Sequence, residues 1–313
     1  MTITQIEYIV AVERNGSFVT AAEKCFVTQP TLSMQIQKLE EELGVKIFDR
    51  NHHPIIPTDM GKLIIEQAKK VIYERDKIDE LISSTKKELI GQLHVGVIPT
   101  VAPSIVPRTL KSFVKKYPSV EITITEMNTD QIIHHLKEGE IDFGILSTPL
   151  HEKSLKETAL YHEPYVLYAA EGHKILKNKT IDPKDVDVNE LWSLGDEHCM
   201  RFQVINLCGK QKFYGAENAF NYHSGSLLSL MRMVDVNGGL TILPELALAD
   251  FPEDIMEQVR PFKDPIPVRE ISLVTNKYFT KNKLAISFTE SLLSQLPDKM
   301  RAKGKKNKVL AIS

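Results

Sequence analysis

The stretch TQPTLSMQIQKLEEELG, residues 28–44, has the pattern of a helix that presents polar side chains to a partner. Thr28 can cap the helix, and Pro30 suits its first turn because the amide that proline lacks would have no partner there. The apolar residues recur at the spacing of one helical face, and they are Leu32, Ile36, Leu39 and Leu43. The opposite face is short and polar, which together with the positive amino end of the helix suits insertion into the major groove of DNA.

The residues around this helix predict a small helical domain with a wing. Thr4-Gln5-Ile6-Glu7 has the form of a capping box, so a first helix is expected to begin there and to end near Arg14. A second helix is expected over about 18–24. Two short segments, 47–50 and 55–58, look like the two sides of a small wing. The alternative interpretation is a helical bundle with no role on DNA.

Charge limits how such a domain can bind DNA. Residues 1–62 contain fewer Lys and Arg than Asp and Glu, and the net charge of the 313 residues is −2. Diffuse attraction to phosphate is therefore weak. Binding has to come from local contacts made by a dimer.

Length and composition indicate the class of protein. A chain of 313 residues with 42% hydrophobic residues is long enough for two or three domains. It has no apolar run near 18 residues and no basic-then-apolar leader, so we expect a cytoplasmic protein that associates with the nucleoid when bound to DNA. Three cysteines do not form a disulfide framework, and in a reducing compartment a pair that does oxidise is typical of a sensor or a catalyst.

A long helix is predicted to follow the first domain. Residues 59–89 contain no proline and only one glycine, Gly61, and their apolar residues repeat near the 3.5-residue period of a coiled coil. These apolar residues are Met60, Ile64, Ala68, Val71, Ile78 and Ile82. The pattern predicts a dimerisation helix that ends before Gly91. The alternative is a solvated helix that packs on its own domain.

Beyond Gly91 the pattern changes to strands alternating with helices, which predicts an α/β domain. The expected elements cover residues 93–98, 104–116, 120–126, 131–137, 141–146, 165–169, 240–243, 271–274 and 281–296. The tail is rich in lysine with little to bury, so residues 301–313 are predicted to be a disordered basic end. A weaker interpretation gives this tail a contact with DNA.

The segment LGDEHCMR, residues 194–201, and Cys208 carry the residues that suggest a chemical function. Asp196 could cap a helix whose first turn contains Cys199. The helix amides would favour the thiolate form of that cysteine, as would two charged or polar neighbours, His198 and Arg201. A thiolate can attack peroxide to give a sulfenic acid, which a second thiol converts to a disulfide.

Cys199 and Cys208 lie nine residues apart. Nine residues of helix span about 13 Å, whereas the Cα atoms of a disulfide are roughly 4.4 to 6.8 Å apart. Forming the disulfide must therefore remodel the segment, which would make it a bistable element. Two alternatives remain: both thiols are inert and buried, or the chain is a peroxidase or a zinc protein that uses His198, Cys199, Cys208 and His223.

The N-terminal motifs resemble those of a known family. They are Ala21-Ala22-Glu23, Thr28-Gln29-Pro30-Thr31-Leu32-Ser33, Leu39-Glu40, Leu43-Gly44, Phe48-Asp49-Arg50 and Thr58-Asp59-Met60-Gly61. This pattern is similar to the winged helix-turn-helix of LysR-type transcriptional regulators. The resemblance implies that the third helix and the wing contact DNA through Thr28, Gln29, Pro30, Thr31, Ser33, Gln35, Lys38 and Arg50.

The same resemblance implies the organisation of the whole chain. LysR-type regulators join a winged helix-turn-helix, here residues 1–58, through a linker and dimerisation helix, 59–90, to a regulatory domain, 91–300. That domain has two Rossmann-like subdomains, as in periplasmic binding proteins, expected here over about 91–165 with 266–300 and over about 166–265. The implied partners are double-stranded promoter DNA, RNA polymerase and further copies of the chain in a homotetramer. The resemblance implies no cofactor, no metal, no membrane and no enzymatic activity.

Within this family, residues 195–201 with Cys208 are similar to the redox segment of members that sense hydrogen peroxide. The resemblance implies an activator of oxidative-stress genes in which Cys199 attacks peroxide and Cys208 resolves it into a reversible disulfide. The implied peroxide pocket consists of Thr100, Thr129, His198 and Arg201. Two positions, Phe202 and Asn221, depart from the pattern. The alternative is a LysR-type regulator that responds to a small metabolite in the cleft.

Overall fold

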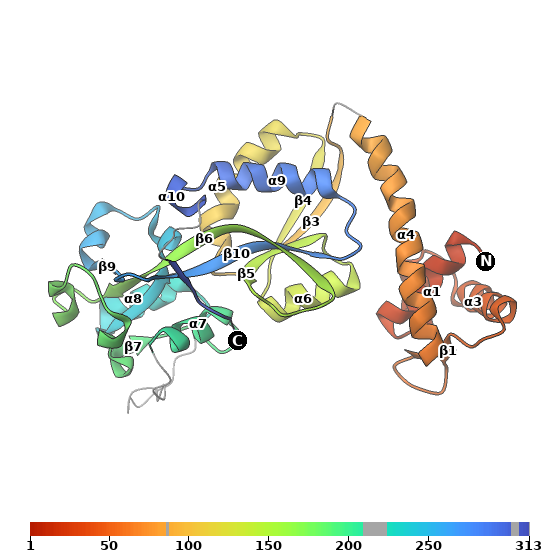
Figure 1. The fold of residues 1–313 in the computed structure, drawn as a ribbon, viewed down its shortest axis with the longest axis horizontal. Helices are drawn as coiled ribbons and strands as arrows, with labels where there is room; N and C mark the ends of the chain where they lie inside the picture. The colour runs from red at the N-terminus through yellow and green to blue at the C-terminus, as the bar shows by residue number, and fades with distance from the viewer. Residues whose placement is uncertain (86–87, 209–223, 302–306, 313) are drawn as a thin grey trace. The chain divides into compact units, whose positions relative to one another are not determined.

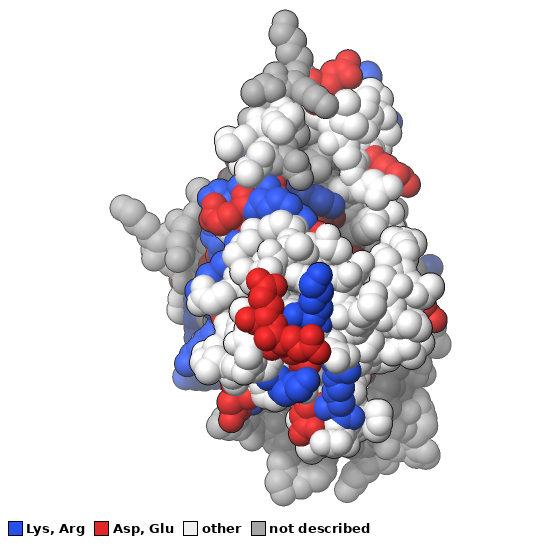
Figure 2. Space-filling model, turned by 90° about the vertical axis from the view of Figure 1, so that its right-hand side faces the viewer, with Lys and Arg blue, Asp and Glu red and all other residues white. Residues whose placement is uncertain are grey.

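Figure 1 shows the computed structural model of the chain, which describes residues 1–85, 88–208, 224–301 and 307–312. The chain divides into two compact units, residues 1–87 with 278–282 and residues 88–277 with 283–313. Acidic and basic side chains lie next to one another on the face shown in Figure 2, as the small net charge leads us to expect.

The first unit begins with three helices and a two-stranded wing. They are α1 (Ile3–Asn15), α2 (Phe18–Lys24), α3 (Gln29–Leu43), β1 (Phe48–Asp49) and β2 (Ile56–Pro57). The predicted start of α1 was wrong, because the capping box uses Thr2 and Gln5 instead of Thr4 and Glu7. The Thr2 hydroxyl accepts from the Gln5 amide at 3.2 Å, and Gln5 Oε1 accepts from the Thr2 amide at 2.9 Å. The helix therefore begins two residues earlier than predicted.

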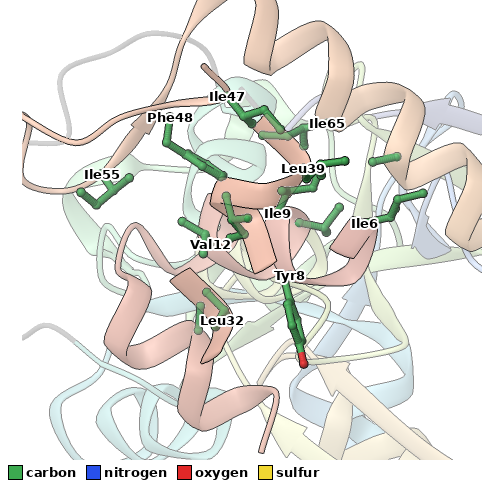
Figure 3. Packing of buried hydrophobic residues seen from close by; sticks show 14 of the residues in the cluster. Ile6, Tyr8, Ile9, Val12, Leu32, Leu39, Ile47, Phe48, Ile55 and Ile65 are labelled. Atoms are coloured by element: carbon green, nitrogen blue, oxygen red, sulfur yellow. The ribbon is translucent and has the colours of Figure 1, made fainter. Parts of the chain in front are cut away.

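Apolar side chains from the three helices and the wing form one core. Figure 3 shows Leu32 and Leu39 of α3 turned toward Ile9 of α1, with Ile47 and Phe48 of the wing closing the cluster. Leu32 and Leu39 are fully buried, whereas Leu43, the last apolar residue of the predicted stripe, is exposed. This packing leaves the polar face of α3 on the surface of the unit.

The long helix α4 (Asp59–Thr85) follows the wing directly. Gly61 in its first turn is required by close packing, since a Cβ there would lie 2.0 Å from the carbonyl oxygen of Ile47. The predicted apolar stripe divides: Ala68 is buried in the core of the first unit, while Met60, Val71, Ile78 and Ile82 remain exposed. The exposed part leaves a row of apolar side chains on the surface of α4.

The second unit is built on a mixed sheet with the strand order β4-β3-β5-β10-β6-β8-β7, with β9 paired to β6 and β11 paired to β10. The strands are β3 (Gly91–Val97), β4 (Val120–Glu126), β5 (Phe143–Thr148), β6 (Leu155–Ala169), β7 (Leu191–Trp192), β8 (Leu240–Pro244), β9 (Val259–Pro261), β10 (Ile266–Asn276) and β11 (Asn307–Val309). The first part of β6, 155–164, pairs with β10, and the last part, 165–169, pairs with β8. The chain therefore passes between two subdomains on β6 and β10, which confirms the predicted α/β fold.

Helices cover both faces of this sheet. They are α5 (Ala102–Lys116), α6 (Thr129–Glu138), α7 (Cys199–Leu207), α8 (Leu227–Asn237), α9 (Asn282–Ser294) and α10 (Asp298–Arg301). The 3-10 turns are η1 (Lys174–Lys177), η2 (Pro183–Asp185), η3 (Val188–Glu190), η4 (Glu245–Leu248) and η5 (Glu253–Gln258). Phe143 of β5 packs on Phe288 of α9, and the next residue, Gly144, lies under Ile132 of α6. Because neighbouring residues of a strand face opposite sides, α9 and α6 cover opposite faces.

The end of the chain differs from the prediction of a disordered tail. Strand β11 pairs in parallel with β10 over 266–268, and the Leu310 amide donates to the Val268 carbonyl at 2.9 Å. Leu310 and Ile312 are buried, and they alternate with exposed Val309 and Ala311 in the two-residue period of a strand. The prediction was wrong for 307–312 because it weighed the lysines and overlooked this apolar alternation; residues 302–306 lie outside the described residues.

Candidate redox site and DNA-binding surface

Helix α7 begins at Cys199 and places Cys208 at its C-cap. Its N-cap residue is His198, which makes no side-chain capping bond, so the predicted cap at Asp196 was wrong. The Asp196 carboxylate instead pairs with Arg201 Nε at 2.6 Å, and Arg201 also donates to the Ser193 hydroxyl at 2.6 Å. The structure thus places the predicted pocket residue Arg201 in a contact with the segment before α7.

The Cys199 thiol is held in its protonated form by its surroundings. Burial raises the pKa of Cys199, and the opposing effects of the Thr129 hydroxyl, the Arg269 charge and the first amides of α7 lower it by less. Burial also lowers the pKa of His198, against the charge of Glu197, so His198 is neutral near pH 7 and adds no positive charge. The prediction of a resting thiolate at Cys199 was therefore wrong. It considered the helix amides and the neighbouring side chains, and it left out the effect of burial on the pKa.

Arg269 of β10 is a cation that lowers the pKa of Cys199, and it was not among the predicted site residues. Its guanidinium is fully buried and donates from Nε to Glu163 Oε2 at 2.8 Å. On its other side it donates to the Thr100 hydroxyl at 2.7 Å and to the Thr100 carbonyl at 3.0 Å. The signal in the sequence was a charged residue inside the apolar strand 266–276.

Two threonines bring hydroxyl groups to the same region. Thr100 follows β3, and because Arg269 donates to its oxygen, the Thr100 hydroxyl keeps its own hydrogen for a further acceptor. Thr129 is the first residue of α6, and its buried hydroxyl lies within hydrogen-bonding reach of the Cys199 thiol. Thr129 lies close enough to Cys199 to lower the pKa of the thiol. The structure thus brings Thr129 and His198 to the start of α7, and Thr100 is linked to this region through Arg269.

Cys208 lies at the opposite end of α7, half-buried against the apolar core that includes Met200, Val204 and Leu207. Burial raises its pKa to about 12. Both cysteines are free thiols. The segment between them is helical, so their Cα atoms are about 13 Å apart along the helix axis, as predicted for a helix of this length. Phe202, one of the two departures, is half-exposed on α7, while Asn221 lies outside the described residues.

The residues expected to contact DNA lie on the polar face of α3. Thr28, Gln29, Pro30, Thr31 and Lys38 are exposed. The Thr28 hydroxyl caps the helix by accepting from the Thr31 amide at 3.4 Å. Two further residues on this face are half-buried, and they are Ser33 and Gln35.

The wing is fixed to α3 by a buried carboxylate. Glu40 Oε1 accepts from the Ile47 amide at 2.8 Å and the Phe48 amide at 3.3 Å, and Glu40 Oε2 pairs with Arg50 at 3.4 Å. The Arg50 guanidinium also lies over the Phe18 ring, 5.0 Å from its centroid. Arg50 is therefore held at the base of the wing with part of its side chain open to solvent.

Metal ligands and membrane-spanning helices can be considered for the described part of the chain. Among these residues, no three His, Cys, Asp or Glu side chains come together as a metal site, and His223 of the zinc alternative lies outside them. In the same part of the chain, every helix is too short or too polar to span a bilayer.

Comparison with known protein families accounts for nearly the whole chain. Residues 3–62 match the bacterial regulatory helix-turn-helix protein, lysR family, and residues 86–297 match the LysR substrate binding domain. The chain belongs to the LysR family. This LysR-family protein is 33% identical over 276 residues to a hydrogen peroxide-inducible genes activator of Haemophilus influenzae, covering 88% of this chain and 90% of that relative.

Two further relatives of the LysR-family chain carry the name OxyR. The DNA-binding transcriptional dual regulator OxyR of Escherichia coli K12 is 34% identical, over 88% of this chain and 89% of that protein. Among solved structures, full-length OxyR C199D from Pseudomonas aeruginosa superimposes with a TM-score of 0.72 and 30% identity, covering 94% of this chain and 98% of that one. The LysR-family chain is thus a DNA-binding transcription regulator similar to OxyR proteins, and its relatives are regulators and not enzymes.

Proposed function

We propose that this protein is a transcription activator that senses hydrogen peroxide by forming a reversible disulfide between Cys199 and Cys208. One observation carries the proposal: Cys199 begins a helix that ends at Cys208, and its thiol lies beside the Thr129 hydroxyl and within the field of Arg269. The similarity to hydrogen peroxide-inducible activators supports the same function.

The first chemical step oxidises Cys199. Its sulfur attacks one oxygen of peroxide, the O–O bond breaks, and the thiol proton goes to the departing oxygen, which gives a sulfenic acid and water. Because burial keeps the thiol protonated at rest, negative charge develops on sulfur only during the reaction. Thr129 and Arg269 stabilise that charge, and the hydrogen of the Thr100 hydroxyl, which Arg269 does not use, would donate to a peroxide oxygen.

The second step joins the two cysteines. The Cys208 sulfur attacks the Cys199 sulfur and the hydroxyl leaves as water, so two thiols and one peroxide become one disulfide and two waters. The helix between them has to open, because its length of about 13 Å exceeds the separation of bridged cysteines. This remodelling supplies the two states that a regulator needs.

Binding to promoter DNA is proposed to require a homo-oligomer, as a dimer of dimers. The N-terminal unit has an apolar groove of about 430 Å³ between α1, α3 and α4, lined by Ile9, Leu39, Leu63 and Val71 among others. Helix α4 of a second copy offers the matching apolar stripe, and pairing would set two copies of α3 at a fixed spacing on DNA. Oxidation would then change the contacts of the bound oligomer with RNA polymerase.

The test is a brief pulse of equimolar peroxide on the full-length chain, followed by alkylation and mass spectrometry. We expect a peptide pair linked through Cys199 and Cys208 in the wild type and no linkage in Cys199→Ser. Cys25→Ser is the matched control, because Cys25 lies in the core of the other unit, and it should leave the linkage unchanged. Oxidation that spares Cys199 would refute the proposal.

A second candidate function is regulation by a small metabolite, with the cysteines incidental. It is favoured by the Thr129 hydroxyl, which is buried at the start of α6, where a ligand oxygen could bind. A protein that forms no disulfide after the peroxide pulse, but shows a ligand-dependent shift in thermal stability that Thr129→Val abolishes, would support this candidate.

A further inference from the structure

The middle of α7 is fastened to three other segments by one side chain, Gln203. This glutamine is completely buried. Its Oε1 atom accepts from the Tyr165 hydroxyl of β6 at 2.6 Å, and its Nε2 atom donates to the Ser147 hydroxyl of β5 at 3.2 Å and to the Leu310 carbonyl at 3.0 Å. The amide thus uses both of its hydrogens as donors and its oxygen as an acceptor.

The third of these segments is the C-terminal end of the chain. The Leu310 amide is bound to Val268 of β10, and its carbonyl is bound to Gln203, so the residue bridges the sheet and α7. The Leu310 side chain is buried in the same apolar core as Met200 and Val204 of α7, and Cys208 packs on that core. The C-terminal segment therefore packs against the helix that carries both cysteines.

These contacts oppose the movement that the proposed disulfide requires. Gln203 lies between Cys199 and Cys208, four residues after the first and five before the second. Bringing the two Cα atoms from the helix length of about 13 Å to the separation of bridged cysteines unwinds or displaces the turn that holds this glutamine. Its buried bonds to Tyr165, Ser147 and Leu310 then cannot all persist, and breaking buried hydrogen bonds slows the change.

We propose that Gln203 is a positioning residue that, with Leu310, holds α7 closed and sets the rate at which the Cys199 sulfenic acid is joined to Cys208. Formation of the disulfide releases the C-terminal segment from α7. This inference rests on the proposed peroxide-sensing function. Unlike the proposed function, the inference concerns only the second step, in which the disulfide forms. It assigns a role to residues that touch neither peroxide nor the reacting sulfur atoms.

The first test compares sulfenic acid formation and disulfide formation in Gln203→Leu. Leucine is similar in size to glutamine but makes no hydrogen bond. Full-length protein is mixed with peroxide, quenched at intervals by alkylation, and analysed by mass spectrometry for sulfenic acid and disulfide. We expect the disulfide step to be about tenfold faster, because the bonds that hold the closed helix are gone. Sulfenic acid formation should stay within about twofold of the wild type, since Gln203 lies a helical turn from the sulfur.

The matched control is Val204→Ala, which loosens the packing of the same helix without removing a hydrogen bond. An equal acceleration in Val204→Ala would overturn the proposal, because general loosening would then explain the effect. An unchanged disulfide step in Gln203→Leu would overturn it as well. Tyr165→Phe removes one of the three bonds, and we expect a smaller acceleration in the same direction.

The second test needs no variant. Hydrogen exchange of the wild type, reduced and after stoichiometric peroxide, is followed at residues 308–312. We expect the Leu310 amide to be protected in the reduced protein and to exchange at least tenfold faster in the oxidised one. Protection that persists after the disulfide has formed would overturn the release of the C-terminal segment and leave the sensing function standing. A wild type that forms no disulfide would refute the proposed function and this inference together.

Discussion

Replacing Thr129 by valine removes the hydroxyl beside Cys199 while keeping the shape of the side chain. The hydroxyl lowers the pKa of Cys199, so its loss leaves the effect of burial less opposed and the pKa rises further. A hydrogen bond to a charged group contributes about 1.5 kcal/mol at the low end of its range. Since 1.4 kcal/mol corresponds to a factor of ten, the thiolate population below the pKa falls about tenfold.

The assay is the rate of alkylation of Cys199 by iodoacetamide between pH 7 and 10, followed by mass spectrometry of its peptide. We expect a rate about tenfold lower than that of the wild type at each pH below the pKa of Cys199. Thr109→Val is the matched control, because the Thr109 hydroxyl on α5 is also buried but does not act on Cys199. Equal alkylation rates for Thr129→Val and the wild type would refute the role of this hydroxyl.

Three further predictions concern stability. Glu40→Ala should destabilise the N-terminal unit by about 2–4 kcal/mol in urea unfolding, because two backbone amides lose a charged acceptor; Lys46→Ala, which removes only an exposed partner of Glu40, is the control. Gly61→Ala should cost about 1–3 kcal/mol in the same assay, since its Cβ would overlap the Ile47 carbonyl, and an unchanged midpoint would contradict the packing described. The lowered pKa of His198 contributes stability that is present above pH 6.5, the ordinary value, and is lost as pH falls below it. His198→Asn should therefore flatten the dependence of melting temperature on pH between 5 and 7, and a slope equal to that of the wild type would exclude this source.

Local signals in the sequence were enough to predict the DNA-binding unit. The cap, proline and apolar spacing of residues 28–44 all act within a few turns, and α3 forms where they indicate. A local signal was wrong at α1, where two overlapping capping boxes compete and the earlier one, from Thr2 to Gln5, closes the helix. The motif itself does not determine which of the two boxes begins the helix.

The redox site depends on contacts that no local pattern contains. Arg269 meets Thr100 across 169 residues and Glu163 across 106, so its place beside Cys199 follows from the folded sheet alone. The state of Cys199 was misjudged for the same reason, since burial is a property of the assembled subdomains. The C-terminal segment was misjudged because composition counts charges, whereas Leu310 finds its place through the core and through Gln203.

The buried ion pair between Arg269 and Glu163 makes the fold depend on both residues together. Either charge alone would be stranded in the interior, so a single substitution at one of them destabilises the fold along with the function. A genetic screen for insensitive variants would therefore recover changes at Arg269 as poorly accumulating protein. Replacing Arg269 and Glu163 together by apolar residues would leave no stranded charge, so we expect the double variant to accumulate better than either single one.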